Sequence, residues 1–253
     1  MKRYLTTTLL LLAITFVLLC KGIVVAEEET LPPDKGLANK IKNEIQKQKK
    51  VSLKHLEVTE VSPGHITIEG IADLYGEKYI AQKTAEKYNL DKIDNNIIVN
   101  PDLMRNDTDI EREIFNKIKS KLVDGYFDDV SFKVSNGVVQ LFGKISRIGL
   151  IKKIMDDVIW IPGVRHVENT MTMLPVSQQD DSIRRQILQK MRNDMRVSHY
   201  FAGSFPNIII IVEGGKVTLK GYVNSNVDKV ILEQIAKSTF NVLSVINMLE
   251  YSQ

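Results

Sequence analysis

Residues Asn136 to Gly143 read NGVVQLFG, a two-residue turn followed by a strand that ends on glycine. Apolar residues alternate with other residues on both sides of the turn, at Val130, Phe132, Val134, Val139 and Leu141. An Asn-Gly turn between two such runs is typical of an antiparallel β-hairpin. The segment therefore predicts two paired strands.

The same hairpin is predicted at two other places. PGHITIEG ends at Gly70 and GGKVTLKG ends at Gly221, so the three terminal glycines are 73 and 78 residues apart. A strand opening with asparagine follows each hairpin at the same spacings, at Asn96 (or equally Asn95), Asn169 and Asn247. A helical apolar row precedes each hairpin at intervals of 73, at Leu37, Ile41 and Ile45, then Ile110, Ile114 and Ile118, then Ile183, Ile187 and Met191. Shared spacings indicate three copies of one unit, with five extra residues in the third copy between Ser198 and Asn207.

Each copy has the order α-β-β-α-β. In the second copy, Asp107 or Thr108 is expected to cap a helix that runs to about Val123. A second helix is expected from about Arg147 to Val158, and VRHVENTMTM forms the last strand. We expect an α+β fold of three tandem two-layer modules, each with two helices on a three-stranded mixed sheet. The expected modules span residues 34–101, 106–175 and 180–253.

The N-terminus has the pattern of a secretory signal. Basic residues precede a short apolar stretch from Leu9 to Cys20, and Ala26 ends a small-residue cleavage site. We expect residues 1–26 to be a signal peptide and the mature chain to be periplasmic or secreted. The alternative is a lipoprotein anchored through Cys20, the only cysteine.

The charge of the mature chain is balanced. Removing residues 1–26 leaves 31 of the 34 basic residues against 31 acidic ones, which argues against nucleic acid as a partner. The sequence has neither a GxGxxG nor a Walker-type phosphate loop, and it has no GxSxG motif. The four histidines are not spaced as metal ligands on a helix. We therefore expect no enzyme activity, no cofactor, no metal and no small-molecule substrate.

The recurrent glycines are interpreted as structural. Glycine supplies the positive φ of tight turns, as expected at Gly64 and Gly137. At the strand ends, glycine is expected to allow close approach of the following helix. The structural set is Gly64, Gly70, Gly137, Gly143, Gly163, Gly215 and Gly221.

The segment NGVVQLFGKI, with the later PGV and VEN, resembles the BON (bacterial OsmY and nodulation) module of envelope and osmotic-stress proteins, which carries a GxVxLxGxV…GVxxVxN pattern. The resemblance covers about residues 34–253 and is strongest in the second copy. The third copy reads FNVLSVIN in place of PGVRHVEN, and the first reads LDKIDNN. The resemblance implies a non-enzymatic envelope protein that binds membrane surfaces or anionic phospholipids, including a role in envelope stress. The alternative is a periplasmic interaction scaffold or stress chaperone with envelope proteins as partners.

Cations and aromatic residues are the candidate contacts for such a partner. Each cation adds about 1 kcal/mol of favourable binding free energy beside an anionic membrane. Aromatic side chains at loop tips favour the headgroup region. The alternatives are a solvated helix face for the cations, and packing against a core or the next module for the aromatic residues. The candidate set is Lys42, Lys47, Lys49, Lys50, Tyr126, Phe127, Trp160, Arg184, Arg185, Arg192, Tyr200 and Phe201.

Overall fold

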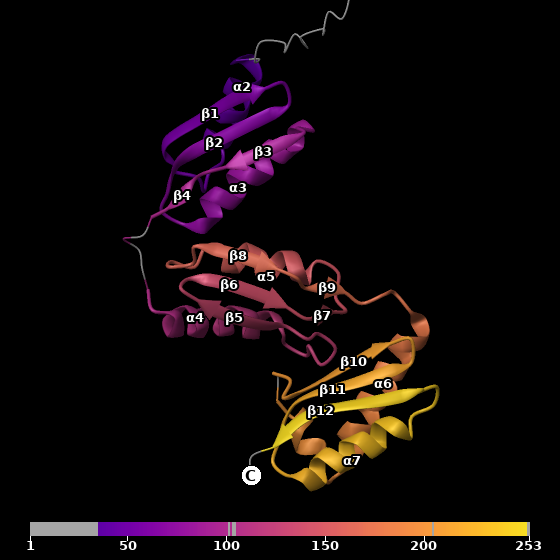
Figure 1. Cartoon of the computed structure of the whole chain (residues 1–253). Helices are drawn as coiled ribbons and strands as arrows, with labels where there is room; N and C mark the ends of the chain where they lie inside the picture. The colour runs from indigo at the N-terminus through magenta and orange to yellow at the C-terminus, as the bar shows by residue number, and fades with distance from the viewer. Residues whose placement is uncertain (1–34, 101, 103–104, 204, 252–253) are drawn as a thin grey trace, which may run out of the picture.

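The computed structural model describes residues 35–100, 102, 105–203 and 205–251, which form three modules in chain order (Figure 1). The expected signal peptide, with Cys20 and Ala26, lies outside the described residues. In the described part of the chain, no helix has both the length and the apolar character needed to cross a bilayer.

Every module has the expected order of helices and strands. Module 1 contains α2 (Lys35–Gln46), β1 (Lys54–Ser62), β2 (His65–Ala72), α3 (Tyr75–Ala85), η1 (Glu86–Tyr88), β3 (Lys92–Asn95) and β4 (Ile98–Val99). Module 2 contains α4 (Asp107–Lys121), β5 (Ser131–Ser135), β6 (Val138–Phe142), β7 (Lys144–Ile145), α5 (Leu150–Val158), β8 (His166–Asn169) and β9 (Thr172–Met173). Module 3 contains α6 (Gln178–Asn193), η3 (Ser198–Phe201), β10 (Ile208–Glu213), β11 (Lys216–Val223), α7 (Asn226–Lys237) and β12 (Ser244–Tyr251).

The sheets are mixed, which confirms the α+β prediction. The hairpins β1–β2, β5–β6 and β10–β11 are antiparallel, whereas β3, β8 and β12 each run parallel to the central strand. A helix crosses over between the central strand and its parallel neighbour, as parallel pairing requires. Figure 1 shows the two helices of module 3 on one face of its sheet. The predicted apolar rows enter the cores, where Ile41, Ile114 and Ile187 are fully buried.

The sequence suggested that the recurrent asparagine opens the last strand, but the structure places it later in that strand. Asn95, Asn169 and Asn247 align opposite the central strand at Ile68, Leu141 and Leu219. The side-chain amides of Asn95 and Asn247 donate to helix carbonyl oxygens, at 3.0 and 3.1 Å, and so attach the strand to α3 and α7. Asn95, rather than Asn96, is therefore the equivalent residue in module 1.

The first helix of module 2 is capped by a different residue from those expected. The Asn106 side chain accepts the Asp109 N–H at 2.7 Å, and the helix ends at Lys121. Asp107 instead accepts the backbone N–H groups of Asn136 and Gly137 at 2.7 and 2.9 Å. Its carboxylate therefore joins the start of the helix to the hairpin turn.

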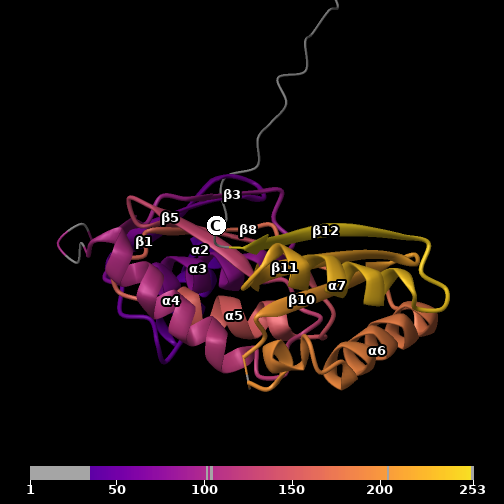
Figure 2. The ribbon, with the colours of Figure 1, turned by 90° about the horizontal axis from the view of Figure 1, so that it is seen from below.

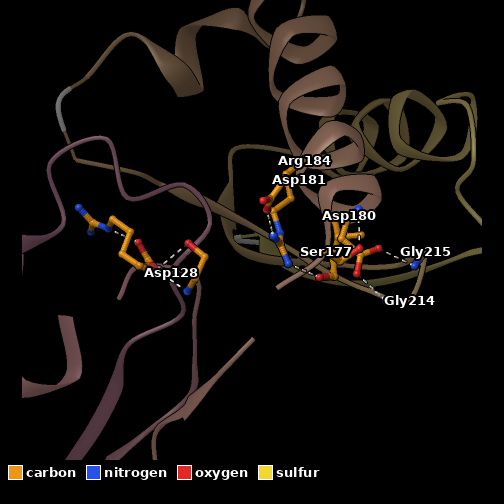
Figure 3. A network of polar contacts seen from close by, with 10 residues as sticks. Asp128, Ser177, Asp180, Asp181, Arg184, Gly214 and Gly215 are labelled. Carbon is orange, nitrogen blue, oxygen red and sulfur yellow. Dashed lines mark hydrogen bonds and ion pairs between the residues drawn. The ribbon is translucent and has the colours of Figure 1, made fainter. Parts of the chain in front are cut away.

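Module 3 repeats this contact with a buried carboxylate. Asp180 accepts the N–H groups of Gly214 and Gly215, each at 2.9 Å (Figure 3). We call the Asp107 and Asp180 contacts the turn clamps. In module 1, Glu60 accepts the Gly64 N–H at 3.2 Å.

All seven glycines of the structural set have a positive φ, but the strand-end glycines have a different role from the one expected. A Cβ at Gly143 or Gly221 would lie 2.0 Å from the carbonyl oxygen of Asp129 or Asn207. Both carbonyls precede the antiparallel partner strand. The close approach is therefore between paired strands and not with the following helix.

Candidate functional site

Modules 1 and 2 pack together through the start of α3. Tyr75 is 7% exposed and belongs to the core of module 2, where its ring meets His166 edge-on at 5.5 Å. Burial raises the pKa of the Tyr75 hydroxyl, and a backbone hydrogen bond with Val167 opposes part of this shift. Next to it, a Cβ on Gly76 would lie 2.6 Å from the indole of Trp160. The lack of a side chain at Gly76 lets α3 lie directly against that ring.

Three lysines follow α2 in the turn before β1, and this turn is fixed next to the same contact. The Glu77 carboxylate of α3 is buried and accepts the Ser52 N–H at 2.6 Å. The other oxygen of Glu77 accepts the N–H groups of Asp73 and Leu74. Glu77 therefore holds the end of the lysine turn against the start of α3.

The lysine turn meets Trp160 across the module boundary. Lys50 Nζ lies 5.4 Å from the centroid of the Trp160 ring, a distance at which the cation and the ring attract each other. Lys47 and Lys49 are exposed beside it, and no ion pair is recorded for either within the described residues. These groups border a hollow of about 470 Å³, which also includes Ile80 and Ile159.

A second hollow of about 760 Å³ adjoins the first between α3 and α5 and shares Ile80 and Asp156 with it. Its lining is largely apolar, with Tyr79, Ile80, Ile151, Met155, Val167 and Met173. We refer to the two hollows together as the junction groove.

The lysines beside the second hollow are already paired. Lys83 donates to Glu86 at 2.6 Å and Lys152 donates to Asp156 at 2.5 Å, and these hydrogen bonds raise the pKa of both lysines. Both cations are charged but largely neutralised by their partners. The junction groove therefore combines a mostly apolar wall with available positive charge at the end formed by Lys47, Lys49 and Lys50.

Modules 2 and 3 pack through an aromatic residue that the sequence suggested for a loop tip. Tyr126 is 1% exposed and belongs to the core of module 3. Its hydroxyl donates to the carbonyl oxygens of Gly203 and Phe201 at 3.0 and 3.2 Å, and its ring lies 5.7 Å from that of Phe201. Arg192 covers the ring at 5.0 Å.

The predicted insertion of module 3 provides the binding surface for Tyr126. Phe201 and Gly203 both lie between Ser198 and Asn207, and Tyr200 is buried in the same core. Phe127 packs partly buried against this cluster. Tyr126, Tyr200 and Phe201 are therefore interior residues of this structure and are not available to enter a headgroup region.

The basic candidates of modules 1 and 3 differ in accessibility. Arg184 is 2% exposed, pairs with Asp181 and donates to the carbonyl oxygen of Val212 (Figure 3). Arg185 is exposed on α6, and Lys42 is half-buried on α2. The candidates therefore fall into two groups. Tyr126, Phe201 and Arg192 meet in the interface between modules 2 and 3, whereas Lys47, Lys49, Lys50 and Trp160 meet beside an open hollow.

Sequence reasoning missed Tyr75, Gly76 and Glu77, which position the groove. The sequence alone did not distinguish them, because the residue 73 positions after Tyr75 is Ile148, another large apolar residue, and only the structure shows that Ile148 is 88% exposed whereas Tyr75 is buried. An aromatic residue at a position that is solvent-exposed in the next copy indicates a contact specific to module 1.

Three consecutive two-layer α-β-β-α-β units define a tandem-module α+β protein. The BON domain pattern matches residues 33–101, 106–175 and 179–253, so the chain belongs to the BON domain family. BON domains are generally non-catalytic binding modules of envelope-associated proteins. Among the described residues, no group of three or more His, Cys, Asp or Glu side chains is arranged to hold a metal ion.

No curated protein matches the chain. The solved structures that are similar to the chain include two of CdsD, a structural protein of the type III secretion system of Chlamydia trachomatis. The first, its C-terminal domain, is 13% identical with a TM-score of 0.24 and covers 88% of this chain and 100% of its own. The second is 13% identical with a TM-score of 0.23 and covers 86% of this chain and 94% of its own.

Proposed function

We propose that this chain binds membrane surfaces rich in anionic phospholipid through the lysine end of the junction groove, as part of envelope protection. The observation that carries the proposal is the meeting of Lys47, Lys49 and Lys50 from module 1 with Trp160 from module 2. Lysines attract anionic headgroups, and tryptophan favours the boundary between headgroups and acyl chains. The two residue types that bind this boundary thus occur side by side.

Vesicle flotation tests the proposal with a matched pair of variants. Replacing Lys47, Lys49 and Lys50 with glutamine removes about 3 kcal/mol of attraction, so binding to anionic vesicles at low salt should weaken about 100-fold. The control replaces Lys117, Lys133 and Lys216, which are exposed on other surfaces, with glutamine. It changes the net charge equally and should bind nearly as well as the native chain.

High salt should release the native chain from anionic vesicles, because exposed charges are screened. Vesicles of zwitterionic lipid should not bind it. If both triple variants lose vesicle binding equally, net charge alone explains the binding, and the junction groove has no specific role. Absence of any flotation with anionic vesicles would instead support the protein-interaction scaffold.

A further inference from the structure

The second hollow of the junction groove presents apolar side chains and few free polar groups. It lies between α3 of module 1 and α5 of module 2, which Figure 2 shows next to each other. Lys83 and Lys152 are paired with acids, and the side-chain oxygen of Asn169 accepts the Met171 N–H at 3.1 Å. The surface left for a ligand is therefore mainly hydrocarbon, including Met173, which is 43% exposed.

The apolar hollow continues directly into the lysine end of the groove. Ile80 and Asp156 line both hollows, so one ligand can extend from the first hollow into the second. The charge of Asp156 is offset, because Lys152 donates to its carboxylate at 2.5 Å. At the other end, no acid pairs with Lys47 or Lys49 among the described residues. The groove therefore has positive charge at one end and a mainly apolar wall at the other.

The hollow of about 640 Å³ between modules 2 and 3 does not separate charge from apolar surface in this way. Its apolar residues are mixed with two ion pairs, Lys220 with Asp129 and Lys144 with Glu213. Both signs of charge lie beside apolar surface there. That arrangement suits neither an apolar chain nor an anionic headgroup.

We infer that the junction groove binds a single anionic lipid molecule, with its phosphate at the lysine end and an acyl chain along the second hollow. The inference rests on the proposed function and extends it from a membrane surface to one bound lipid. Charge complementarity places the phosphate, and the continuity of the two hollows places the chain. The second hollow, at about 760 Å³, has the size of a small-molecule site.

The walls of the second hollow favour an acyl chain over an extended peptide. A peptide that adds to a sheet needs a free strand edge for its backbone hydrogen bonds. The second hollow is lined mainly by the helices α3 and α5, in which most backbone groups bond within the helix. An acyl chain needs no hydrogen bonds and gains from apolar contact alone.

Titration with alkyl phosphates tests the inference without a membrane. The protein is residues 27–253, which include every described residue. The ligands are inorganic phosphate and butyl, hexyl, octyl and decyl phosphate, each below its critical micelle concentration. Trp160 is the only tryptophan and lines the groove, so its fluorescence reports binding. An open hollow covers about half of each methylene group, so affinity should rise about 4-fold for each two carbons added, with inorganic phosphate binding weakest.

A neutral pair of substitutions separates the chain site from the lysines. Ile151→Gln with Met173→Gln removes apolar surface from the second hollow and leaves every charge in place. Decyl phosphate should bind this variant about 10-fold more weakly, and most of the dependence on chain length should disappear. The matched control, Val176→Gln with Met195→Gln, changes two residues that are each 93% exposed elsewhere and should behave like the native chain. Met173→Gln alone should give a smaller loss in the same direction, and circular dichroism checks that each variant is folded.

The headgroup end is tested by charge. Replacing Lys47, Lys49 and Lys50 with glutamine should weaken the binding of every alkyl phosphate by a similar factor and leave the dependence on chain length unchanged. Decyl maltoside, which has the same chain and an uncharged head, should bind the native protein at least about 10-fold more weakly than decyl phosphate.

Three results would overturn the inference: affinity that does not depend on chain length, an unchanged dependence in the Ile151 and Met173 variant, or equal binding of the two decyl compounds. Vesicle flotation tests the proposed function separately. If anionic vesicles bind the native chain while the dependence on chain length is absent, the proposed function stands and the acyl-chain site does not exist.

Discussion

At the scale of single residues, the turn clamps show how one carboxylate connects two elements. Asp107 and Asp180 each lie in the first turn of a helix. Each accepts two backbone N–H groups from a hairpin turn that follows much later in the chain. The Gly215 N–H is buried in module 3. Without the carboxylate these donors would lose partners that water cannot fully replace.

Replacing Asp180 with alanine should therefore destabilise the protein by about 2–3 kcal/mol, from two charge-assisted hydrogen bonds. Urea-induced unfolding followed by circular dichroism measures the change. Gln179→Ala, at the exposed neighbouring position, should change stability by less than about 0.5 kcal/mol. Equal stability of the two variants would show that the clamp contributes nothing.

The sequence contains a signal for the clamps that the pattern alone could not interpret. Asp34, Asp107 and Asp180 share the spacing of 73 residues, and acidic residues at a helix start have an adequate explanation in the helix dipole. Periodicity predicts which face of a helix is buried, but it does not tell which distant N–H group meets a carboxylate. The structure shows this at Asp107 and Asp180, while Asp34 lies outside the described residues.

At the scale of elements, the α-β-β-α-β order followed from the sequence because each boundary has its own turn chemistry or change of period. The aromatic loops were less predictable. Tyr126 and Phe201 lie in separate copies, and nothing local distinguishes an aromatic side chain that faces solvent from one that enters a neighbouring core. The five-residue insertion was located correctly, but its role in receiving Tyr126 depends on how the modules pack.

Replacing Tyr126 with alanine should remove about 3–5 kcal/mol of packing between modules 2 and 3. Because the ring belongs to the core of module 3, thermal unfolding by calorimetry should separate into two transitions. Tyr126→Phe keeps the ring and should cost about 1 kcal/mol while retaining a single transition. Unfolding of Tyr126→Ala that matches the native chain would show that the two modules are not coupled through this residue.

At the scale of the whole molecule, the three modules are packed units and not separate domains on linkers. Tyr75 enters the core of module 2, and Tyr126 enters the core of module 3. An ion pair between Lys220 and Asp129 at 2.6 Å and another between Lys144 and Glu213 join modules 2 and 3 as well. This packing produces the junction groove, since its lysines and its tryptophan come from different modules.

The central claim is that membrane binding needs the junction and not only the lysines, and Gly76→Val tests it most directly. A valine side chain at this position collides with Trp160, whereas valine suits a helix slightly better than glycine does, so module 1 itself should remain folded. Every lysine and Trp160 stay in the chain, but the turn and the indole are pushed apart. In vesicle flotation at low salt, we expect Gly76→Val to bind anionic vesicles about 10-fold more weakly than the native chain, a change of about 1.4 kcal/mol. Binding equal to that of the native chain would contradict the claim.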